Sequence, residues 1–396
     1  MNWKSVRLRR IRSQRLVLVL LASMLIFSAL GGSIYGEEPP TITVSKGGKI
    51  NLTISQLGGS DGVAATKILQ NDLTLCGYFT LSGSASYTAR GTASGGSLAG
   101  QVVDPSGGTV LSKSYNGSAR EDAHRFANDI IETLTGNKGF ATSKIAFIAT
   151  RSGKKEVYVG DYDGTNVRQL THDGVISVHP AISPDGRRIA YTSYQSGYPD
   201  VYTIDLASGA RNRIVNFPGT NSGAAFSSDG GRIALTVSKD GNPELYTVGA
   251  SGGSARRLTR TRGIESGPTW SPSGEEIIYS FDDGRGPQLC RISSGGGTGQ
   301  PIATGHGYCT EPNWSPDGKE VAFNVRGAGG FEVAIVDLGR GGSRVVSAGE
   351  NPVWGADSRH IMFTEGGALY LLDTVTSHKS QILEGLGKIS EPSWSR

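Results

Sequence analysis

The 396-residue sequence has few cysteines and histidines, and their spacing excludes the usual disulfide and metal frameworks. Its three cysteines, Cys76, Cys290 and Cys309, are too few for a disulfide-stapled fold. A single bridge, Cys290–Cys309, and buried free thiols are both compatible with the sequence. The six histidines show no HExxH motif and no paired spacing, so neither a metal site nor a cofactor is predicted.

The first 36 residues lack acidic side chains and resemble an export signal. Six Lys and Arg residues precede an apolar run at residues 16–30, and small residues follow up to Gly36. The run is short and soon interrupted, which favours a cleaved signal peptide over an uncleaved anchor. Cleavage after Ser33 and cleavage after Gly36 are equally consistent with the pattern. No cysteine lies near either point, so no lipid anchor is expected.

The rest of the chain has no excess of positive charge. The first 36 residues hold six of the 39 basic residues, which leaves 33 basic against 35 acidic residues. The positive charge of the whole chain therefore belongs to the signal. It gives no indication of nucleic-acid binding.

Glycine and proline are abundant, and they occur in a repeating stretch. With 58 glycines and 16 prolines, many tight turns and a largely β protein are expected. The stretch EPNWSPDGKEVAF at residues 311–323 recurs with variations along the second half of the chain. Its anchoring apolar positions are spaced by 44, 44, 44, 40 and 40 residues: Ile182, Phe226, Trp270, Trp314, Trp354 and Trp394.

A period of this length with strand chemistry is typical of a β-propeller with four strands per blade. In Ser-Pro-Asp-Gly, Pro fixes φ and Gly accepts a positive φ, as a tight turn requires. The first unit, residues 144–171, lacks an inner strand, and EPSWSR at 391–396 is an inner strand without a blade. Joining them predicts six blades in a closed ring without open edges.

The segment before the propeller has different periodicities and predicts a small two-layer α/β domain. Its expected elements are a strand at 41–54, a helix at 61–75, a hairpin from 101–105 and 109–115, and an amphipathic helix at 119–136. The predicted organisation is a signal peptide at 1–36, the α/β domain at 37–140 and the all-β propeller at 141–396.

Two stretches match the G-x-S-x-G pattern of hydrolases, GGSDG at 58–62 and GASGG at 249–253. Neither has recognisable acid–base partners, and the second falls in a turn between strands. In the first, Ser60 or Asp61 suits a helix N-cap. No catalytic residue is predicted.

Acidic residues in the turns are interpreted as turn chemistry. Asp161 and Asp163 in GDYDG supply only half of a calcium loop. His179 stands in a loop at the predicted channel mouth, where partner contact and simple loop filling are equally good explanations. The aspartates of the SPDG-type turns each lie in a different blade, and other blades alter the pattern: Asp185, Asp229 and Asp317.

Three features carry a family resemblance. They are the six WSPDG-type motifs with the split blade, the junction FANDIIETLTGNKGFATSKIAFIA at 126–149 and the turn VGDYDGTN at 159–166. Together they resemble the TolB family, periplasmic components of the Tol–Pal cell-envelope system. The motif is shared with prolyl oligopeptidases, so the junction and the domain order are the specific part.

The resemblance implies a monomeric, non-catalytic periplasmic adaptor with an α/β domain and a six-bladed propeller. Such proteins bind the peptidoglycan-associated lipoprotein Pal on one propeller face and TolA through an extended N-terminal segment. Other outer-membrane proteins are further candidate partners. The system links the envelope layers and acts in cell division. Here the segment begins EEPP, more acidic and proline-rich than expected for the family, and comprises Glu37, Glu38, Thr41, Ile42, Thr43 and Val44.

Partner contacts are expected in the loops that enter the inner strands, because these loops cluster round the channel mouth. Members of the family tend to have His where this chain has Thr220, so its contact with Pal is expected to differ. The expected contact residues are Val178, His179, Thr220, Asn221, Ile264, Glu265, Thr310, Glu311, Glu350, Asn351, Ser390 and Glu391.

Two other functions remain as alternatives. A peptidase-like enzyme would need a hydrolase domain, and the roughly 100 residues between signal and propeller are too few for one. A small-ligand or sugar site in the central channel would be favoured by aromatic side chains pointing into it. The motif tryptophans are better explained as blade core.

Overall fold

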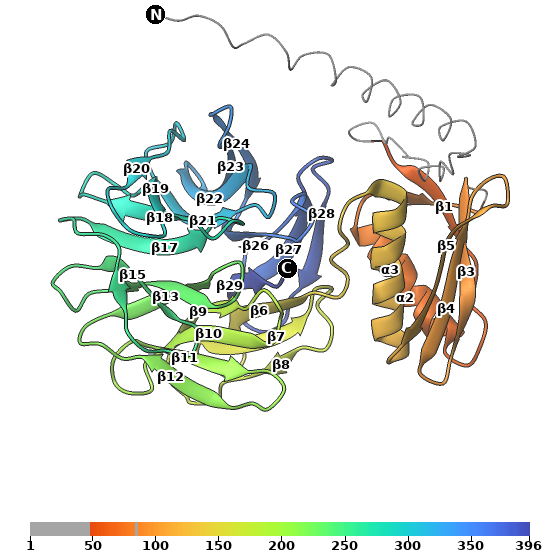
Figure 1. Cartoon of the computed structure of the whole chain (residues 1–396), viewed down its shortest axis with the longest axis horizontal. Coiled ribbons are helices and arrows are strands. Elements are labelled where there is room, and N and C mark those ends of the chain that lie inside the picture. Colours follow the sequence, from red (N-terminus) through yellow and green to blue (C-terminus); the bar gives the residue numbers. More distant parts are fainter. Residues whose placement is uncertain (1–47, 84–85) are drawn as a thin grey trace, which may run out of the picture. The chain divides into compact units, whose positions relative to one another are not determined.

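The structure is a computed structural model that describes residues 48–83 and 86–396. The predicted signal peptide and the predicted TolA-contact segment at 37–44 lie outside these residues. Within them, no helix combines the length and the apolar character needed to span a bilayer. The described part contains one five-stranded sheet with two helices, followed by six four-stranded sheets (Figure 1). This confirms a six-bladed β-propeller preceded by a small two-layer α/β domain.

The α/β domain is a mixed sheet in the order β2-β1-β3-β4-β5, with both helices on one face (Figure 1). β1 pairs in parallel with β2 and β3, and β3, β4 and β5 form an antiparallel meander. Strands β2 and β3 were not predicted from the sequence. The elements are β1 (Ile50–Ile54), α2 (Gly62–Leu75), β2 (Phe79–Leu81), β3 (Tyr87–Ser94), β4 (Ser97–Val103), β5 (Thr109–Asn116) and α3 (Ala119–Thr135).

Helix α3 shows why the local sequence folds as it does. Ser118 and Glu121 form a capping box at its start, and Gly136 ends it at φ 71°. Its apolar residues recur every three or four positions and face the sheet. Phe126 lies so close to β4 that a Cβ on Gly100 would come within 2.7 Å of its ring. Glycine at this position therefore lets helix and sheet approach.

The propeller consists of six antiparallel sheets, each with its inner strand towards a common centre (Figure 1). In chain order the blades are β6 (Lys144–Ala149), β7 (Glu156–Asp161) and β8 (Arg168–Gln169); β9 (Ser177–Ile182), β10 (Arg188–Ser193), β11 (Asp200–Asp205) and β12 (Arg211–Val215); β13 (Asn221–Phe226), β14 (Arg232–Val237), β15 (Glu244–Gly249) and β16 (Arg256–Arg257); β17 (Ile264–Trp270), β18 (Glu276–Asp282), β19 (Gln288–Ser293) and β20 (Gln300–Pro301); β21 (Cys309–Trp314), β22 (Glu320–Gly327), β23 (Gly330–Asp337) and β24 (Ser343–Ala348); β25 (Glu350–Trp354), β26 (His360–Glu365), β27 (Ala368–Asp373) and β28 (Lys379–Leu383).

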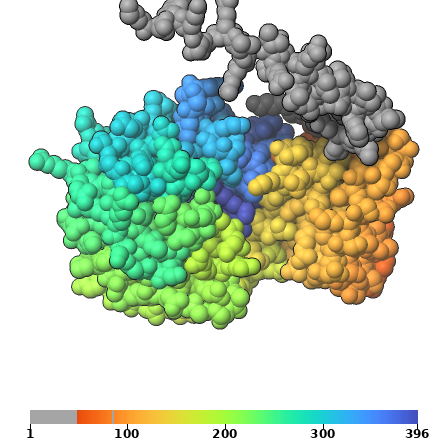
Figure 2. Space-filling view, in the orientation of Figure 1, coloured from red at the N-terminus to blue at the C-terminus, as the bar shows by residue number. Residues whose placement is uncertain are grey.

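The last strand, β29 (Ile389–Trp394), completes the first blade by pairing with β6. Trp394 lies opposite Ile145, and Ser395 exchanges two 2.9 Å hydrogen bonds with the backbone of Lys144. In the space-filling view the C-terminal atoms, in dark blue, lie among segments distant in sequence (Figure 2). The ring therefore has no open sheet edge at the junction of its two ends.

The repeated motif builds the turn and the inter-blade core. Ser315 Oγ donates 2.6 Å to Asp317 Oδ1, which also accepts the backbone N–H of Lys319. Asp185 and Asp229 accept the same bonds in their own blades. The motif tryptophans are buried between neighbouring blades, as Trp270 shows by donating its indole N–H to Ala225 O of the preceding blade. These aspartates therefore hold turns.

Candidate functional site

A ring of six equivalent residues surrounds the propeller channel. Each inner strand has a bulge, and the residue three positions before the motif anchor takes a positive φ of 50–67°. All six line a central cavity of about 580 Å³. In blade order the ring is Glu391, His179, Gly223, Gly267, Glu311 and Asn351.

The non-glycine members of this ring adopt a conformation that normally favours glycine. A left-handed conformation costs such residues about 1 kcal/mol or more each, and it persists only where surrounding structure fixes it. Here the bulge in each inner strand supplies that constraint. The ring is thus a set of side chains held at one level of the channel by the repeat itself.

Four members of the ring carry polar side chains, and the two that are glycine leave one side open. The neighbouring Gly223 and Gly267 leave room, since a Cβ on either would meet no atom nearer than 3.7 Å. On the opposite side Glu391 accepts the His179 backbone N–H at 2.6 Å and the Lys155 ammonium at 3.2 Å. The channel therefore offers a recess beside fixed hydrogen-bonding groups.

Glu311 is the charged ring member whose side chain has no hydrogen-bond partner among the described residues. Among the described residues nothing donates a hydrogen bond to its half-buried carboxylate. Burial raises its pKa, the negative charge of Glu391 adds to this, and His179 opposes it. A carboxylate in this state gains from any donor or cation that enters the channel.

The cavity also contains a basic group. The Arg396 guanidinium lines it and donates a 2.7 Å hydrogen bond to Trp314 O, beside the motif turn. Burial lowers the pKa of Arg396 to about 10, so it remains charged at neutral pH. The cavity thus combines the ring carboxylates with a cation near the motif turns.

The structure brings together four of the predicted contact residues, His179, Glu311, Asn351 and Glu391, in the channel ring. Val178, Thr310 and Ser390 are half-buried immediately before ring members, and Glu350 is exposed beside Asn351.

In two blades the predicted positions are displaced by two residues. The ring members there are Gly223 and Gly267, not Asn221 and Glu265. Thr220 and Ile264 still line the cavity, and Ile264 is 51% exposed.

Asn221 and Glu265 correct the prediction of partner contact, because both are completely buried. Asn221 donates to Asp200 Oδ1 at 3.2 Å, and Glu265 accepts from the Thr261 hydroxyl at 2.6 Å. Their side chains point into the junction with the preceding blade. Because glycine has no side chain, the sequence contains no signal that Gly223 and Gly267 are the ring positions, and the prediction chose the wrong residues.

Sequence reasoning missed the loop between β10 and β11. Tyr198 is 71% exposed and Tyr194 is 41% exposed, and Tyr194 N–H donates to the carbonyl of Ile176, itself exposed before β9. Pro199 O accepts the backbone N–H of Asn221, which joins this loop to the entry of the next inner strand. Two tyrosines among small polar residues in a hairpin loop were a usable signal, since exposed aromatics are enriched at interfaces.

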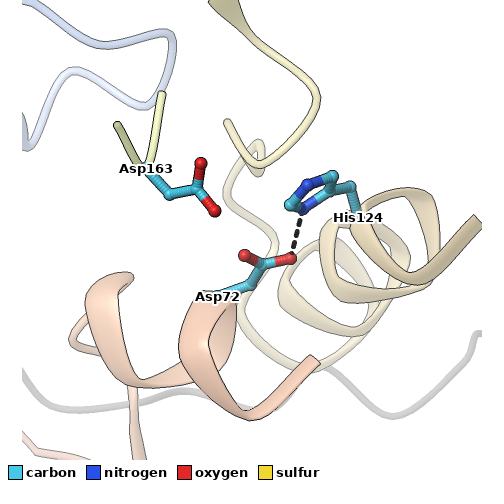
Figure 3. A group of neighbouring side chains, drawn as sticks. All are labelled: Asp72, His124 and Asp163. Atoms are coloured by element: carbon cyan, nitrogen blue, oxygen red, sulfur yellow. Dashed lines mark hydrogen bonds and ion pairs between the residues drawn. The ribbon is translucent and has the colours of Figure 1, made fainter. Parts of the chain in front are cut away.

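A second cluster of polar side chains joins α2, α3 and the turn after β7 (Figure 3). Atoms of Asp72, His124 and Asp163 lie within 4.8 Å of one another. Asp72 accepts from His124 Nδ1 at 2.6 Å and from Tyr162 at 2.7 Å, while Asp163 accepts from Arg120 at 2.6 Å and from Thr165. Every carboxylate oxygen is thus occupied by a donor. The cluster is a hydrogen-bonded seam between the α/β domain and the first blade.

The three cysteines are free and buried. Of the two alternatives for Cys290 and Cys309, the structure has separate thiols. They lie in different inter-blade cores, and Cys309 Sγ contacts the Thr304 hydroxyl at 3.2 Å. Burial raises the pKa of the Cys290 thiol to about 11, which leaves it unreactive at neutral pH.

The G-x-S-x-G serine of the α/β domain has no catalytic surroundings. Ser60 Oγ is hydrogen-bonded to Ser94 Oγ at 3.1 Å, both on an exposed surface. Asp61 occupies the N-cap position of α2 but makes no side-chain cap bond, because its carboxylate accepts the Gly95 N–H instead. The predicted N-cap position is therefore confirmed at Asp61, but the side-chain cap hydrogen bond is absent.

Comparisons with known proteins agree with this architecture. The family model described as the TolB beta propeller domain matches residues 131–396. The Tol-Pal system protein TolB of Geobacter sulfurreducens is 32% identical over 213 residues, covering 44% of this chain and 49% of the relative. That of Geobacter metallireducens is 34% identical over 215 residues, covering 45% and 50%. The matches thus span about half the length of these curated relatives.

A solved structure extends the likeness to most of the chain. The crystal structure of TolB from Acinetobacter baumannii superposes with a TM-score of 0.79 and 25% identity, covering 88% of this chain and 97% of the other. This likeness includes the α/β domain as well as the blades. The chain belongs to the TolB β-propeller family.

Proposed function

We propose that this chain is the TolB-type adaptor of a Tol–Pal system, exported to the periplasm and without catalytic activity. Its propeller binds Pal at the channel mouth, and residues 37–44 bind TolA. Through these contacts it supports outer-membrane integrity and cell division. Family membership and the names of its relatives support the system, and the channel ring supports the binding face.

The observation that carries the binding face is the unpaired carboxylate of Glu311 inside an accessible cavity. Exposed apolar side chains, Tyr198 and Ile264 among them, lie on the loops around the same mouth. Exposed aromatic and apolar side chains next to a few fixed polar groups are typical of protein-binding sites.

The test uses the mature chain and the soluble domain of Pal from the same organism, titrated by calorimetry. We expect Glu311→Gln and Tyr198→Ala each to weaken binding by about tenfold or more, as for interface hot spots. The matched control is Glu275→Gln, an exposed glutamate in a motif turn at the other end of an inner strand. Weakening by Glu275→Gln alone would place Pal on the opposite face.

The TolA contact has a separate test. Deletion of residues 37–44 is expected to abolish binding of the TolA periplasmic domain while leaving Pal binding unchanged. Loss of both would show that the segment supports folding. Labelling of the purified protein by a fluorophosphonate would contradict the non-catalytic proposal.

A further inference from the structure

Two buried carboxylates meet at the junction between the third and fourth blades. Glu244 begins β15, and Glu265 is the second residue of the inner strand β17. Both are completely buried. Thr261 bridges them, because its backbone N–H donates to Glu244 Oε1 at 2.9 Å and its hydroxyl donates to Glu265 Oε1 at 2.6 Å. The two acids are therefore held by the same residue.

The pair has more oxygens than donors. Glu244 Oε1 also accepts from Arg257 at 2.7 Å, but Oε2 of Glu244 and Oε2 of Glu265 are buried without any partner. Two ionised carboxylates in such a place repel each other and lack solvation. A single proton on the pair removes one charge and supplies a donor.

Equivalent junctions in the other blades show how unusual this pairing is. At each junction between blades, a backbone N–H at or next to the start of the inner strand donates a hydrogen bond to the preceding blade. The acceptor is the carbonyl of the residue just before the third-strand position that corresponds to Glu244. Where Asp200 occupies the third-strand position, Asn221 of the inner strand donates an amide hydrogen bond to it. Within the described blades Glu265 is the sole acid at the inner-strand position, which is otherwise Ser177, Asn221, Cys309, Gly349 and Ile389.

We propose that the buried pair of Glu244 and Glu265 holds one proton, and that this proton keeps the loop 260–264 closed at the mouth of the channel. The role of the loop in partner binding rests on the proposed function, whereas the proton site itself does not. The proton acts as the donor that an asparagine supplies in the preceding junction.

The electrostatic surroundings support a proton bound near neutral pH. Burial, and then the charge of Glu244, raise the pKa of Glu265 to about 7, while the Thr261 hydroxyl and Arg257 oppose the shift. The other titratable side chains that interact with Glu265 are Tyr279 of β18 and Cys290 of β19. Arg257 is the cation of the group and is already bound to Glu244.

The loop transmits the state of the pair to the channel. Thr261 Oγ1 accepts the N–H of Gly263 at 3.0 Å, and Gly263 O accepts from Asn242 at 2.6 Å. The next residue, Ile264, is exposed and lines the cavity. Loss of the proton leaves two buried like charges, and opening of the loop relieves their repulsion by admitting water, although the Thr261 hydroxyl then has a stronger acceptor.

Stability measured against pH tests the shared proton. A carboxyl with a raised pKa stabilises the folded state at low pH, and this stabilisation is lost as pH rises towards the folded value. Relative to Glu265→Gln, the unfolding equilibrium constant of the wild-type mature chain is expected to rise about tenfold per pH unit from pH 5 to 7 and then level off. The matched control Glu350→Gln, an exposed mouth-loop glutamate, should follow the wild type.

Should Glu265→Gln fail to fold, Glu244→Gln serves in its place. Its pH dependence should move to lower pH, because Glu265 remains buried but no longer faces a like charge. Parallel pH profiles of the wild type and the foldable variant would overturn the proposal. So would stabilisation of the wild type at pH 8 by 1 mM calcium chloride that the variant does not show, since that would place a metal ion at the pair.

Trypsin cleavage after Arg260 and Arg262 reports on the loop directly. With rates normalised to a small peptide substrate at each pH, the wild type should be cut several-fold faster at pH 8.5 than at pH 6.5, and Glu265→Gln equally slowly at both. Equal ratios in both proteins would overturn the link to the loop. No partner is present in either assay, so a failure of Pal binding is a separate result.

Discussion

The hydroxyl of Tyr162, in the turn after β7, donates a 2.7 Å hydrogen bond to Oδ1 of Asp72 in helix α2. The two residues are 90 positions apart, and Asp72 is almost completely buried. Burial raises the pKa of this carboxyl, while the bonds from His124 and Tyr162 lower it again. The α/β domain is thus attached to the propeller through a buried polar contact, and the loss of any one of its hydrogen bonds would destabilise it.

Replacing Tyr162 by Phe should therefore cost stability. The change removes one donor from a buried carboxylate, and we expect a loss of about 1–3 kcal/mol in unfolding free energy, measured by urea denaturation. Tyr198→Phe is the control, because that side chain is 71% exposed. Equal stabilities of the two variants would show that the seam contributes nothing.

The ion pair between Arg359 and Asp373 should make the stability of the folded chain depend on pH in the acid range. Burial opposes ionisation of Asp373, but hydrogen bonds from Arg359 and Thr376 outweigh it and hold its pKa below the ordinary value. The resulting stabilisation is present above the unfolded value and lost as pH falls through the folded one. Arg359→Met should cost about 2 kcal/mol at pH 7, and the difference from wild type should shrink below about pH 4. A difference independent of pH would contradict the ion pair.

A side chain at position 100 should clash with its neighbours within the α/β domain. A methyl group at this position would lie 2.7 Å from the ring of Phe126, so Gly100→Ala should destabilise the chain by about 1–3 kcal/mol. Gly329→Ala is the control, since nothing lies within 4 Å of a Cβ there and its φ is not positive. Thermal unfolding followed by circular dichroism compares the two. An unchanged Gly100→Ala would mean that α3 can move away from the sheet.

Replacement of Trp394 tests how much the closing strand β29 contributes to the free energy of unfolding. The side chain is buried, its indole N–H donates 2.6 Å to Ser143 Oγ, and its ring contacts Phe140. Trp394→Ala should cost about 3–5 kcal/mol, the usual range for a buried aromatic residue. Deletion of residues 389–396 should cost more and abolish a single cooperative transition, because β6 then becomes an open edge. A deletion variant as stable as the point variant would show that closure is dispensable.

The propeller could be predicted because each blade repeats the same local chemistry. The anchors Trp270 and Trp314, the turn prolines and the β-branched residues agree on one period, and strand length follows from it. In two blades the residue that faces the channel could not be predicted, because Gly223 and Gly267 have no side chain to mark these positions. Strand β2 was missed because a strand of three residues is too short to show an alternating pattern of apolar and polar side chains.

The seam was beyond sequence reasoning because its partners are distant in the chain. One signal was present, however. Residues 355–360, GADSRH, depart from the SPDG motif, and the structure places His360 5.0 Å from Phe140 and Arg359 over Tyr78 at 4.2 Å. In this blade the departure from the repeat marks the contact with residues before the propeller.

Lys144 and Ser395, which join two strands of the same blade, are 251 positions apart in the chain. A contact between such distant residues closes a large loop, so the first blade is not completed by local contacts alone. A variant or proteolytic fragment without β29 would keep five complete blades and leave unfinished the blade that is hydrogen-bonded to the α/β domain.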